Sequence, residues 1–166
     1  MLPENPMNKS LIRQQILERL NDELLAARSA LQSAHEAATH EDSVAENKSD
    51  TFGLEAAYLA HGQAVRVQEI EQAIAAYRNL PLAGTSPDGT VRLGTLVTLE
   101  SATGAHKLIF LGPDGAGVKV TENGQKIVVI TPRSPLGQSL LGKLEGDEVV
   151  IEANGAKQLF EILSVR

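Results

Sequence analysis

The chain has 166 residues, of which 42% are hydrophobic and 22% charged, the composition of a soluble globular protein with one or two domains. It contains no cysteine, which excludes a disulfide scaffold, a cysteine-ligated metal and a thiol nucleophile. The net charge is −6, and residues 1–80 carry 12 acidic against 7 basic side chains, which argues against direct binding of duplex DNA.

The sequence shows no sign of a membrane or secretory segment. No apolar run approaches the ~20 residues of a membrane span. The first ten residues, MLPENPMNKS, lack the basic and apolar regions of a secretory signal. We therefore expect a cytoplasmic protein that has no membrane partner.

Apolar residues recur at steps of three and four near the N-terminus, which predicts a long first helix. Asn8 or Ser10 is expected to cap its start. Residues 1–52 contain no glycine, so nothing in the sequence interrupts this helix. The apolar stripe consists of Ile12, Ile16, Leu20, Leu24, Ala27, Leu31, Ala34 and Ala38.

A second helical stripe ends before Pro81. His61 is expected at a seam position of this helix, and Gly62 lies inside it. Each helix would have about 30 residues, and the polar connection is short, so the two helices should pair as an antiparallel coiled-coil hairpin over residues 8–80. The second stripe consists of Leu54, Tyr58, Val65, Val67, Ile70, Ile74 and Tyr77.

Residues 81–90 are rich in turn formers and are interpreted as a linker. Short β-type runs separated by turn residues follow, and they predict a small, mostly antiparallel sheet over residues 91–166. Ser134–Leu141 is the one helical segment expected there, with Ser134 as N-cap and Gly142 as C-terminal stop. The predicted strands are Val91–Leu99, Lys107–Leu111, Lys126–Ile130, Glu148–Ile151 and Gln158–Val165.

Two segments resemble catalytic motifs without meeting their requirements. His35 and His40 are five residues apart, whereas two zinc ligands on one helix face need a spacing of four. Gly137 to Lys143 follows most of a phosphate-loop pattern, but Leu144 stands where that loop needs a Ser or Thr for magnesium. We interpret the first segment as solvated helix and the second as a short helix with its glycine stop.

The expected hairpin tip, residues 41–50, carries four carboxylates and one Lys. Carboxylate oxygens are the ligands that hard cations such as magnesium prefer. The same acids would also favour the N-terminus of the next helix, where the helix dipole is positive. Either a metal-directed tip or a solvated acidic loop is compatible with this composition.

The run from Ile130 to Ile151, with its Ser-Pro pair, its Leu-Leu-Gly-Lys segment and its Gly-Asp pair, resembles the signature of the Gre transcript-cleavage factors of bacterial RNA polymerase. Glu46-Asn47 is similar to the Glu-Asn pair at the tip of that family. The resemblance implies an α+β fold, in which an N-terminal antiparallel two-helix coiled coil precedes a C-terminal FKBP-like antiparallel β domain with one short helix.

The resemblance also implies a function. The C-terminal domain would dock on RNA polymerase, and the coiled coil would enter the secondary channel and modulate cleavage of backtracked RNA. The chain would be an accessory factor rather than an enzyme, with no cofactor of its own beyond the Mg²⁺ of the polymerase active site. We expect a monomer that meets the nascent RNA 3′ end and DNA only through the elongation complex.

The family pattern assigns roles to the tip. Asp42 and Glu46 would be the metal-directed acids that act in trans, supported by Glu41, Asn47 and Asp50. The family has an Asp three residues before Glu46, where this chain has Ser43, so the assignment of Asp42 needs a shift of one residue.

Three alternative functions stay open. The chain could occupy the channel as a regulator or inhibitor without cleavage activity, it could be an FKBP-like prolyl isomerase or chaperone, or it could be a coiled-coil interaction protein that associates with itself through its seam. The isomerase needs an aromatic-lined pocket, and residues 81–166 contain only Phe110 and Phe160 as aromatics.

Overall fold

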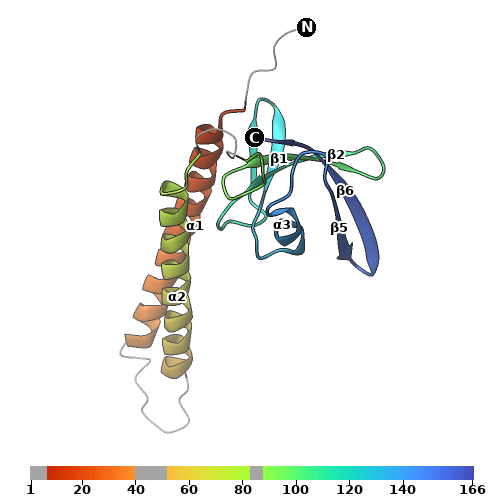
Figure 1. Ribbon diagram of the computed structural model, residues 1–166. Helices are drawn as coiled ribbons and strands as arrows, with labels where there is room; N and C mark the ends of the chain where they lie inside the picture. Colours follow the sequence, from red (N-terminus) through yellow and green to blue (C-terminus); the bar gives the residue numbers. More distant parts are fainter. Residues whose placement is uncertain (1–6, 40–51, 83–87) are drawn as a thin grey trace. The chain divides into compact units, whose positions relative to one another are not determined.

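The structure of the protein is a computed structural model, which describes residues 7–39, 52–82 and 88–166 (Figure 1). The chain divides into two compact units: Met1–Leu17 with Ala76–Arg166, and Glu18–Ala75. No described helix is long and apolar enough to cross a membrane. In chain order the elements are α1 Lys9–Thr39, α2 Phe52–Arg78, β1 Leu96–Ser101, β2 His106–Leu111, β3 Lys119–Glu122, β4 Gln125–Ile130, α3 Pro135–Leu140, β5 Glu148–Ala153 and β6 Ala156–Val165.

Helix α1 begins where the sequence predicts. The Asn8 side chain accepts hydrogen bonds from the backbone N–H groups of Ser10 and Leu11, at 3.0 and 3.3 Å, so Asn8 is the cap. The predicted apolar stripe is the buried face of the helix: six of its eight members are buried, and Leu31 and Ala38 are half-buried.

Helix α2 forms as predicted, but the first half of its predicted stripe is wrong. Leu54 and Tyr58 are 57% and 71% exposed, and Val65 and His61 are also exposed. The buried positions there are Ala56 and Ala60. The buried face of this part of the helix therefore consists of small alanines rather than of the larger apolar residues. The buried and half-buried row is Ala56, Ala60, Gln63, Val67, Ile70, Ile74 and Tyr77, which repeats at steps of four and three.

The six strands form one sheet in the order β3-β4-β2-β1-β6-β5. Four of the five neighbouring pairs are antiparallel, as predicted for most of the sheet, but β2 and β4 pair in parallel. The difference arises from β3, a four-residue strand that the sequence analysis missed. The chain passes from β2 to the sheet edge, forms β3, and returns between β3 and β2 as β4.

The predicted Asn-Gly hairpin turns are confirmed. Asn123 and Gly124 join β3 to β4 with φ angles of 50° and 73°. Asn154 and Gly155 join β5 to β6 with φ angles of 53° and 76°. Two consecutive positive φ angles define the type I′ turn, whose twist matches that of the strands it connects.

The first predicted strand, Val91–Leu99, is too long at its start. The chain turns at Gly94, whose φ is +90°, and Thr95 N–H donates to the Arg92 carbonyl at 3.1 Å. Strand β1 therefore begins only at Leu96. Val91 is buried nonetheless, because its side chain belongs to the core that contains Leu136 and Leu140 of α3, and its backbone bonds to Gly142 and Lys143.

Helix α3 packs against one face of the sheet and contacts β5 (Figure 1). Side chains alternate along β1 and β2, so every second residue faces this helix. The sheet core on this side consists of Val91, Val97, Leu99, Ile109, Leu111, Leu136, Leu140, Val149, Phe160, Ile162 and Val165.

The ends of α3 explain the glycine-containing segment that resembles a phosphate loop. Ser134 caps the helix by accepting from Gly137 N–H at 3.0 Å, and Gly142 ends it with a φ of +78°. Gly137 is buried, and a Cβ there would collide with the Thr131 carbonyl. The glycines thus serve packing and chain reversal.

Candidate functional site: the helical hairpin and its root

The second unit is a pair of antiparallel helices, made of α1 from Glu18 onward and α2 up to Ala75. Its interior combines leucines and isoleucines with many alanines. The buried positions follow a narrow seam in alternating steps of about three and four residues, which is typical of a two-stranded coiled coil. Its buried residues are Leu20, Leu24, Ala27, Ala34, Ala56, Ala60, Ile70, Ala73 and Ile74.

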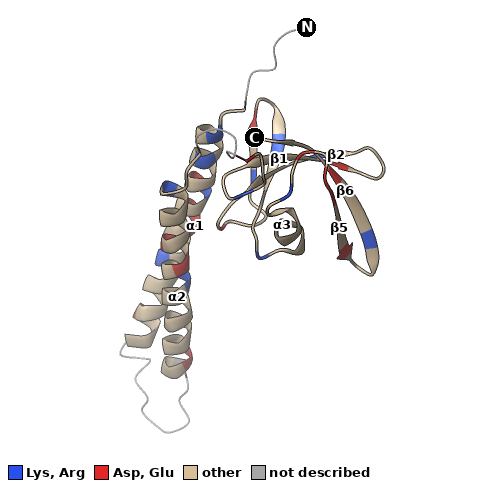
Figure 2. Ribbon diagram, in the orientation of Figure 1, with Lys and Arg blue, Asp and Glu red and all other residues tan. Residues whose placement is uncertain are grey.

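Basic and acidic residues occur along both helices (Figure 2), and two ion pairs join α1 to α2. Arg28 and Glu71 lie 2.9 Å apart, and Arg66 and Glu23 lie 3.2 Å apart. All four side chains are about half exposed, so each pair contributes about 0.5 kcal/mol or less to folding. The ion pairs therefore add little to the stability that the apolar seam provides.

The predicted tip residues Glu41, Asp42, Glu46, Asn47 and Asp50 lie outside the described residues, as does His40. Helix α1 ends at Thr39 and α2 begins at Phe52, so the tip segment connects two helices that pair with each other. Within residues 7–39, 52–82 and 88–166, no group of three or more His, Asp or Glu side chains could hold a metal ion.

The root of the hairpin is defined here as the first turns of α1 and the end of α2, which belong to the unit that contains the sheet. Gln15 of α1 forms two hydrogen bonds with the backbone of Thr121 in the edge strand β3. Its amide nitrogen donates to the Thr121 carbonyl at 2.7 Å, and its amide oxygen accepts from the Thr121 N–H at 3.1 Å. The side chain thereby pairs with the edge strand as a neighbouring strand would.

Tyr77, near the end of α2, is fully buried, and its hydroxyl donates to the backbone carbonyl of Asp114 in the loop after β2. Burial raises the pKa of Tyr77 above its ordinary value, and the Asp114 charge raises it further, although the backbone hydrogen bond acts in the opposite direction. A Cβ on residue 112 would collide with the Tyr77 hydroxyl, so only glycine fits at this position.

Two basic side chains of α1 complete the root. Lys9 Nζ donates to the Gly94 carbonyl at 3.1 Å, and an Arg13 nitrogen donates to the Leu80 carbonyl at 3.2 Å. Burial lowers the pKa of Lys9, and the nearby positive charge of Arg92 lowers it further. Both cations therefore bind backbone carbonyls of the segment between α2 and β1.

No local sequence pattern predicted these root contacts. Tyr77 could have been singled out, because an aromatic residue with a hydroxyl at the end of a buried stripe needs a hydrogen-bond partner. Gln15 gave no such signal, since a glutamine between two buried isoleucines is also compatible with a solvated position. Its partner is more than one hundred residues away in the chain, as the 2.7 Å bond to Thr121 shows.

Comparison with known proteins identifies the family of this chain. The family model "Transcription elongation factor, GreA/GreB, C-term" matches residues 86–166. A transcription elongation factor GreA of Nitratidesulfovibrio vulgaris is 33% identical over 152 residues, which cover 90% of this chain and 85% of the relative. One from Methylococcus capsulatus is 28% identical over 167 residues, with 96% and 99% covered.

Among solved structures, the GreA factor homolog 1 (Gfh1) of Thermus thermophilus is similar at 22% identity with a TM-score of 0.38, over 90% of this chain and 94% of that one. The family assignment rests on the sequence relatives, whose similarity extends over both the helical hairpin and the sheet. The chain belongs to the GreA/GreB family of transcription elongation factors.

Proposed function

We propose that this chain binds RNA polymerase in the cytoplasm during elongation and inserts its helical hairpin into the secondary channel. The tip carboxylates then reach the polymerase active site, where they stimulate cleavage of backtracked RNA. The observation that carries the proposal is the 33% identity to a transcription elongation factor GreA over 90% of the chain, hairpin included.

The described hairpin supports this proposal. Two helices of 31 and 27 residues pair along a narrow seam, and about 1.5 Å per residue gives them lengths near 45 and 40 Å. Such a pair can present its connecting segment in a narrow space. That segment contains Asp42 and Glu46, so the carboxylates would arrive on a support that is already folded.

The proposed chemistry uses oxygen ligands that this chain lends to another active site. Carboxylates suit the coordination of Mg²⁺, which the polymerase would supply and which assists attack of water on the RNA phosphodiester. Asp42 and Glu46 would hold negative oxygens towards that ion, with Glu41, Asn47 and Asp50 beside them. The chain would then act as an accessory factor and not as an enzyme by itself.

The test is RNA shortening in a backtracked elongation complex, measured with and without the full-length protein. We expect the wild type to accelerate shortening and Asp42→Ala and Glu46→Ala to lose most of the effect. Glu36→Ala is the matched control, because Glu36 is an exposed acid on α1 that lies before the tip segment. Unchanged shortening in both tip variants would disprove the role of these acids.

Because this chain has Ser43 where the family pattern has an Asp, one further outcome of the experiment is informative. If the wild type binds the polymerase but leaves the rate of RNA shortening unchanged or lowers it, the chain is a channel-binding regulator without cleavage activity. If it does not bind the polymerase at all, the entire proposal fails. Binding is measured separately, by co-purification of the protein with core polymerase.

A further inference from the structure

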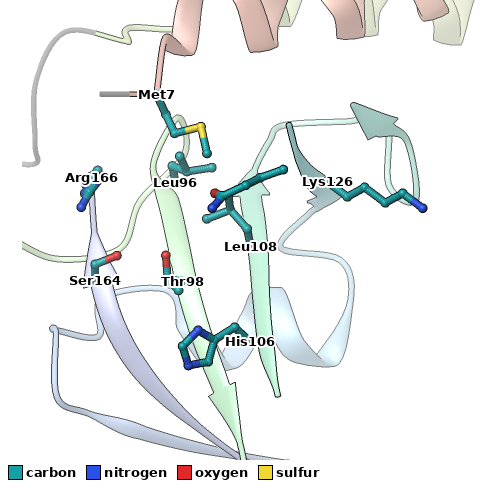
Figure 3. Close-up of a pocket in the computed structure, with 9 residues that line it drawn as sticks. Met7, Leu96, Thr98, His106, Leu108, Lys126, Ser164 and Arg166 are labelled. Atoms are coloured by element: carbon teal, nitrogen blue, oxygen red, sulfur yellow. The ribbon is translucent and has the colours of Figure 1, made fainter. Parts of the chain in front are cut away.

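Exposed apolar side chains gather on helix α2 rather than on the sheet. The sheet unit has a pocket of about 540 Å³, but Leu96 in its lining is only 2% exposed, so the pocket offers a ligand little apolar surface (Figure 3). On α2, by contrast, four large apolar side chains within twelve residues are between 41% and 71% exposed: Leu54, Tyr58, Leu59 and Val65. Clustered exposed apolar side chains mark an interaction surface, whereas single ones are ordinary.

Three of these side chains share one face of α2 with His61, which is also exposed. We call Leu54, Tyr58, His61 and Val65 the outer stripe. Their spacing of four, three and four residues keeps them within about 60° of one another around a helix that turns 100° per residue. The buried row of α2 lies about 180° away, so the outer stripe faces away from α1. A narrow stripe with this spacing is a coiled-coil seam, and its natural occupant is another helix.

The surroundings of the outer stripe are uncharged. Between Glu55 and Arg66 the sequence has no Asp, Glu, Lys or Arg, and Figure 2 shows this part of α2 almost entirely in tan. Ala57 and Ala64 are exposed beside the stripe, and a Cβ on Gly62 would meet no atom within 4 Å. Solvated faces of surface helices normally carry charged and polar side chains. This face therefore has the composition of a surface that another helix covers.

The order of the outer stripe makes it complementary to itself. Its spacing of four, three and four is the same in both directions along the helix. Two copies of α2 that run antiparallel therefore place Leu54 of each copy opposite Val65 of the other, and Tyr58 opposite His61. Such an arrangement has twofold symmetry, in which one surface patch meets its own copy.

The residues beside the stripe favour the same antiparallel arrangement. Glu55 and Arg66 lie on one flank of the helix, so the arrangement brings Glu55 of each copy near Arg66 of the other. A parallel pair in register would place like charges together instead. Arg66 already pairs with Glu23 of α1 but its side chain is 54% exposed, which leaves room for a second carboxylate. On the other flank, Ala57 of each copy meets Ala64 of the other.

We propose that two copies of this chain associate as an antiparallel dimer through the outer stripe. The stripe spans only about 16 Å of helix, so the interface is small and the dissociation constant is about 100 µM. The monomer expected from the sequence is then the form that prevails in dilute solution. A dimer covers the half of α2 next to the tip segment, so only the monomer would enter the polymerase channel. This last consequence rests on the proposed function, whereas the dimer itself does not.

The test is sedimentation equilibrium of the full-length protein without polymerase, at about 5 to 500 µM, a range that includes the expected dissociation constant. We expect the average mass to rise from that of one chain towards that of two. A mass of one chain at every concentration would overturn the proposal, and so would assembly beyond two chains. Because no polymerase is present, either result leaves the proposed function untouched.

Two charged variants test the antiparallel pairing. Leu54→Lys and Val65→Glu should each weaken dimerisation at least about tenfold, because each dimer would bury two charges against apolar side chains. An equimolar mixture of the two variants should dimerise again, because the new ammonium of one copy lies opposite the new carboxylate of the other. Undiminished dimerisation of either variant alone, or a mixture that stays monomeric, would contradict the pairing.

The matched control is Leu59→Lys. Leu59 is 56% exposed and lies in the same segment of α2, but about 130° from the centre of the outer stripe. Its variant should dimerise as the wild type does, and circular dichroism should show equal helix content in all variants. A loss of dimerisation as large as that of Leu54→Lys would overturn the assignment of the interface to the outer stripe.

Discussion

The Tyr77 hydroxyl links the end of α2 to the loop that follows β2. The ring is fully buried, so its hydroxyl cannot exchange this hydrogen bond for one with water. Loss of the hydroxyl would also leave the Asp114 carbonyl without this donor. A buried polar group without a partner costs more free energy than the hydrogen bond itself contributes. The hydroxyl therefore stabilises the root beyond the apolar contacts of the ring.

Tyr77→Phe should lower the free energy of unfolding by about 1–2 kcal/mol, because the ring stays in place while its hydrogen bond is lost. Chemical denaturation of the full-length chain measures the change. Tyr58→Phe is the control: Tyr58 is 71% exposed and its variant should unfold like the wild type. Equal stability of the Tyr77 variant and the wild type would contradict the assigned role of the hydroxyl.

The raised pKa of Tyr77 also predicts a pH dependence. The unfolded chain loses the phenol proton near its ordinary pKa of 10, whereas the folded chain keeps it to higher pH. The folded state therefore binds more protons above pH 10, so this contribution to stability is complete below pH 10 and declines as pH rises. The free energy of unfolding should fall less steeply above pH 10 in Tyr77→Phe than in the wild type. Parallel profiles would show that Tyr77 titrates normally.

Two glycines inside helices should respond in opposite ways to alanine. Gly62 of α2 has no neighbouring atom within 4 Å of an added Cβ, so Gly62→Ala should raise stability by about 1 kcal/mol through helix propensity. Gly137→Ala should lower it by about 3 kcal/mol, because the Cβ collides with the Thr131 carbonyl. Thermal unfolding of the two variants and the wild type measures both changes in stability. Destabilisation by Gly62→Ala, or tolerance of Gly137→Ala, would contradict these packing assignments.

At the scale of elements, the two long helices differ in how well the sequence predicts their buried face. In α1 the large apolar residues and the buried face coincide, so the spacing of Ile12, Ile16 and Leu20 identifies it directly. In the first half of α2 the alanines are buried and Leu54 and Tyr58 are exposed. Hydrophobicity alone cannot separate two faces that both carry apolar residues. In the structure, the face with the smaller residues is the buried one.

Substitutions on the two faces of α2 test this assignment. Ile70→Ala should cost about 2–4 kcal/mol, since Ile70 is 2% exposed and its loss leaves a cavity. Leu54→Ala should change stability by less than about 0.5 kcal/mol, since Leu54 is 57% exposed. Denaturation of the full-length variants measures both. Comparable losses of stability in the two variants would instead support the predicted stripe, in which Leu54 belongs to the buried face.

In the sheet, the turns could be predicted from neighbouring residues, whereas the pairing of the strands could not. Turn chemistry is local, so Asn123-Gly124, Asn154-Gly155 and the Ser134 cap could be predicted from neighbouring residues. Strand pairing is not local. The short strand β3 has too few residues for a clear alternation, and its omission concealed the parallel pairing of β2 with β4.

At the scale of the whole molecule, the order of a helical hairpin followed by a small sheet domain could be predicted, and the family relationship agrees with it. The root could not, because Gln15 and Tyr77 find partners that are far away in sequence. The roles of Asp42 and Glu46 stay predictions, because they depend on the tip segment and on an active site in another protein.

The most direct measurement of the central claim is the rate of RNA cleavage in a backtracked elongation complex as a function of factor concentration. The account predicts that the double variant Asp42→Ala/Glu46→Ala lowers the maximal rate about 100-fold, the effect expected when oriented charged groups are removed from a reacting centre. It also predicts that the half-saturating concentration changes less than about twofold, because the rest of the hairpin and the sheet are intact. A maximal rate equal to that of the wild type would contradict the claim that this chain acts through its tip carboxylates.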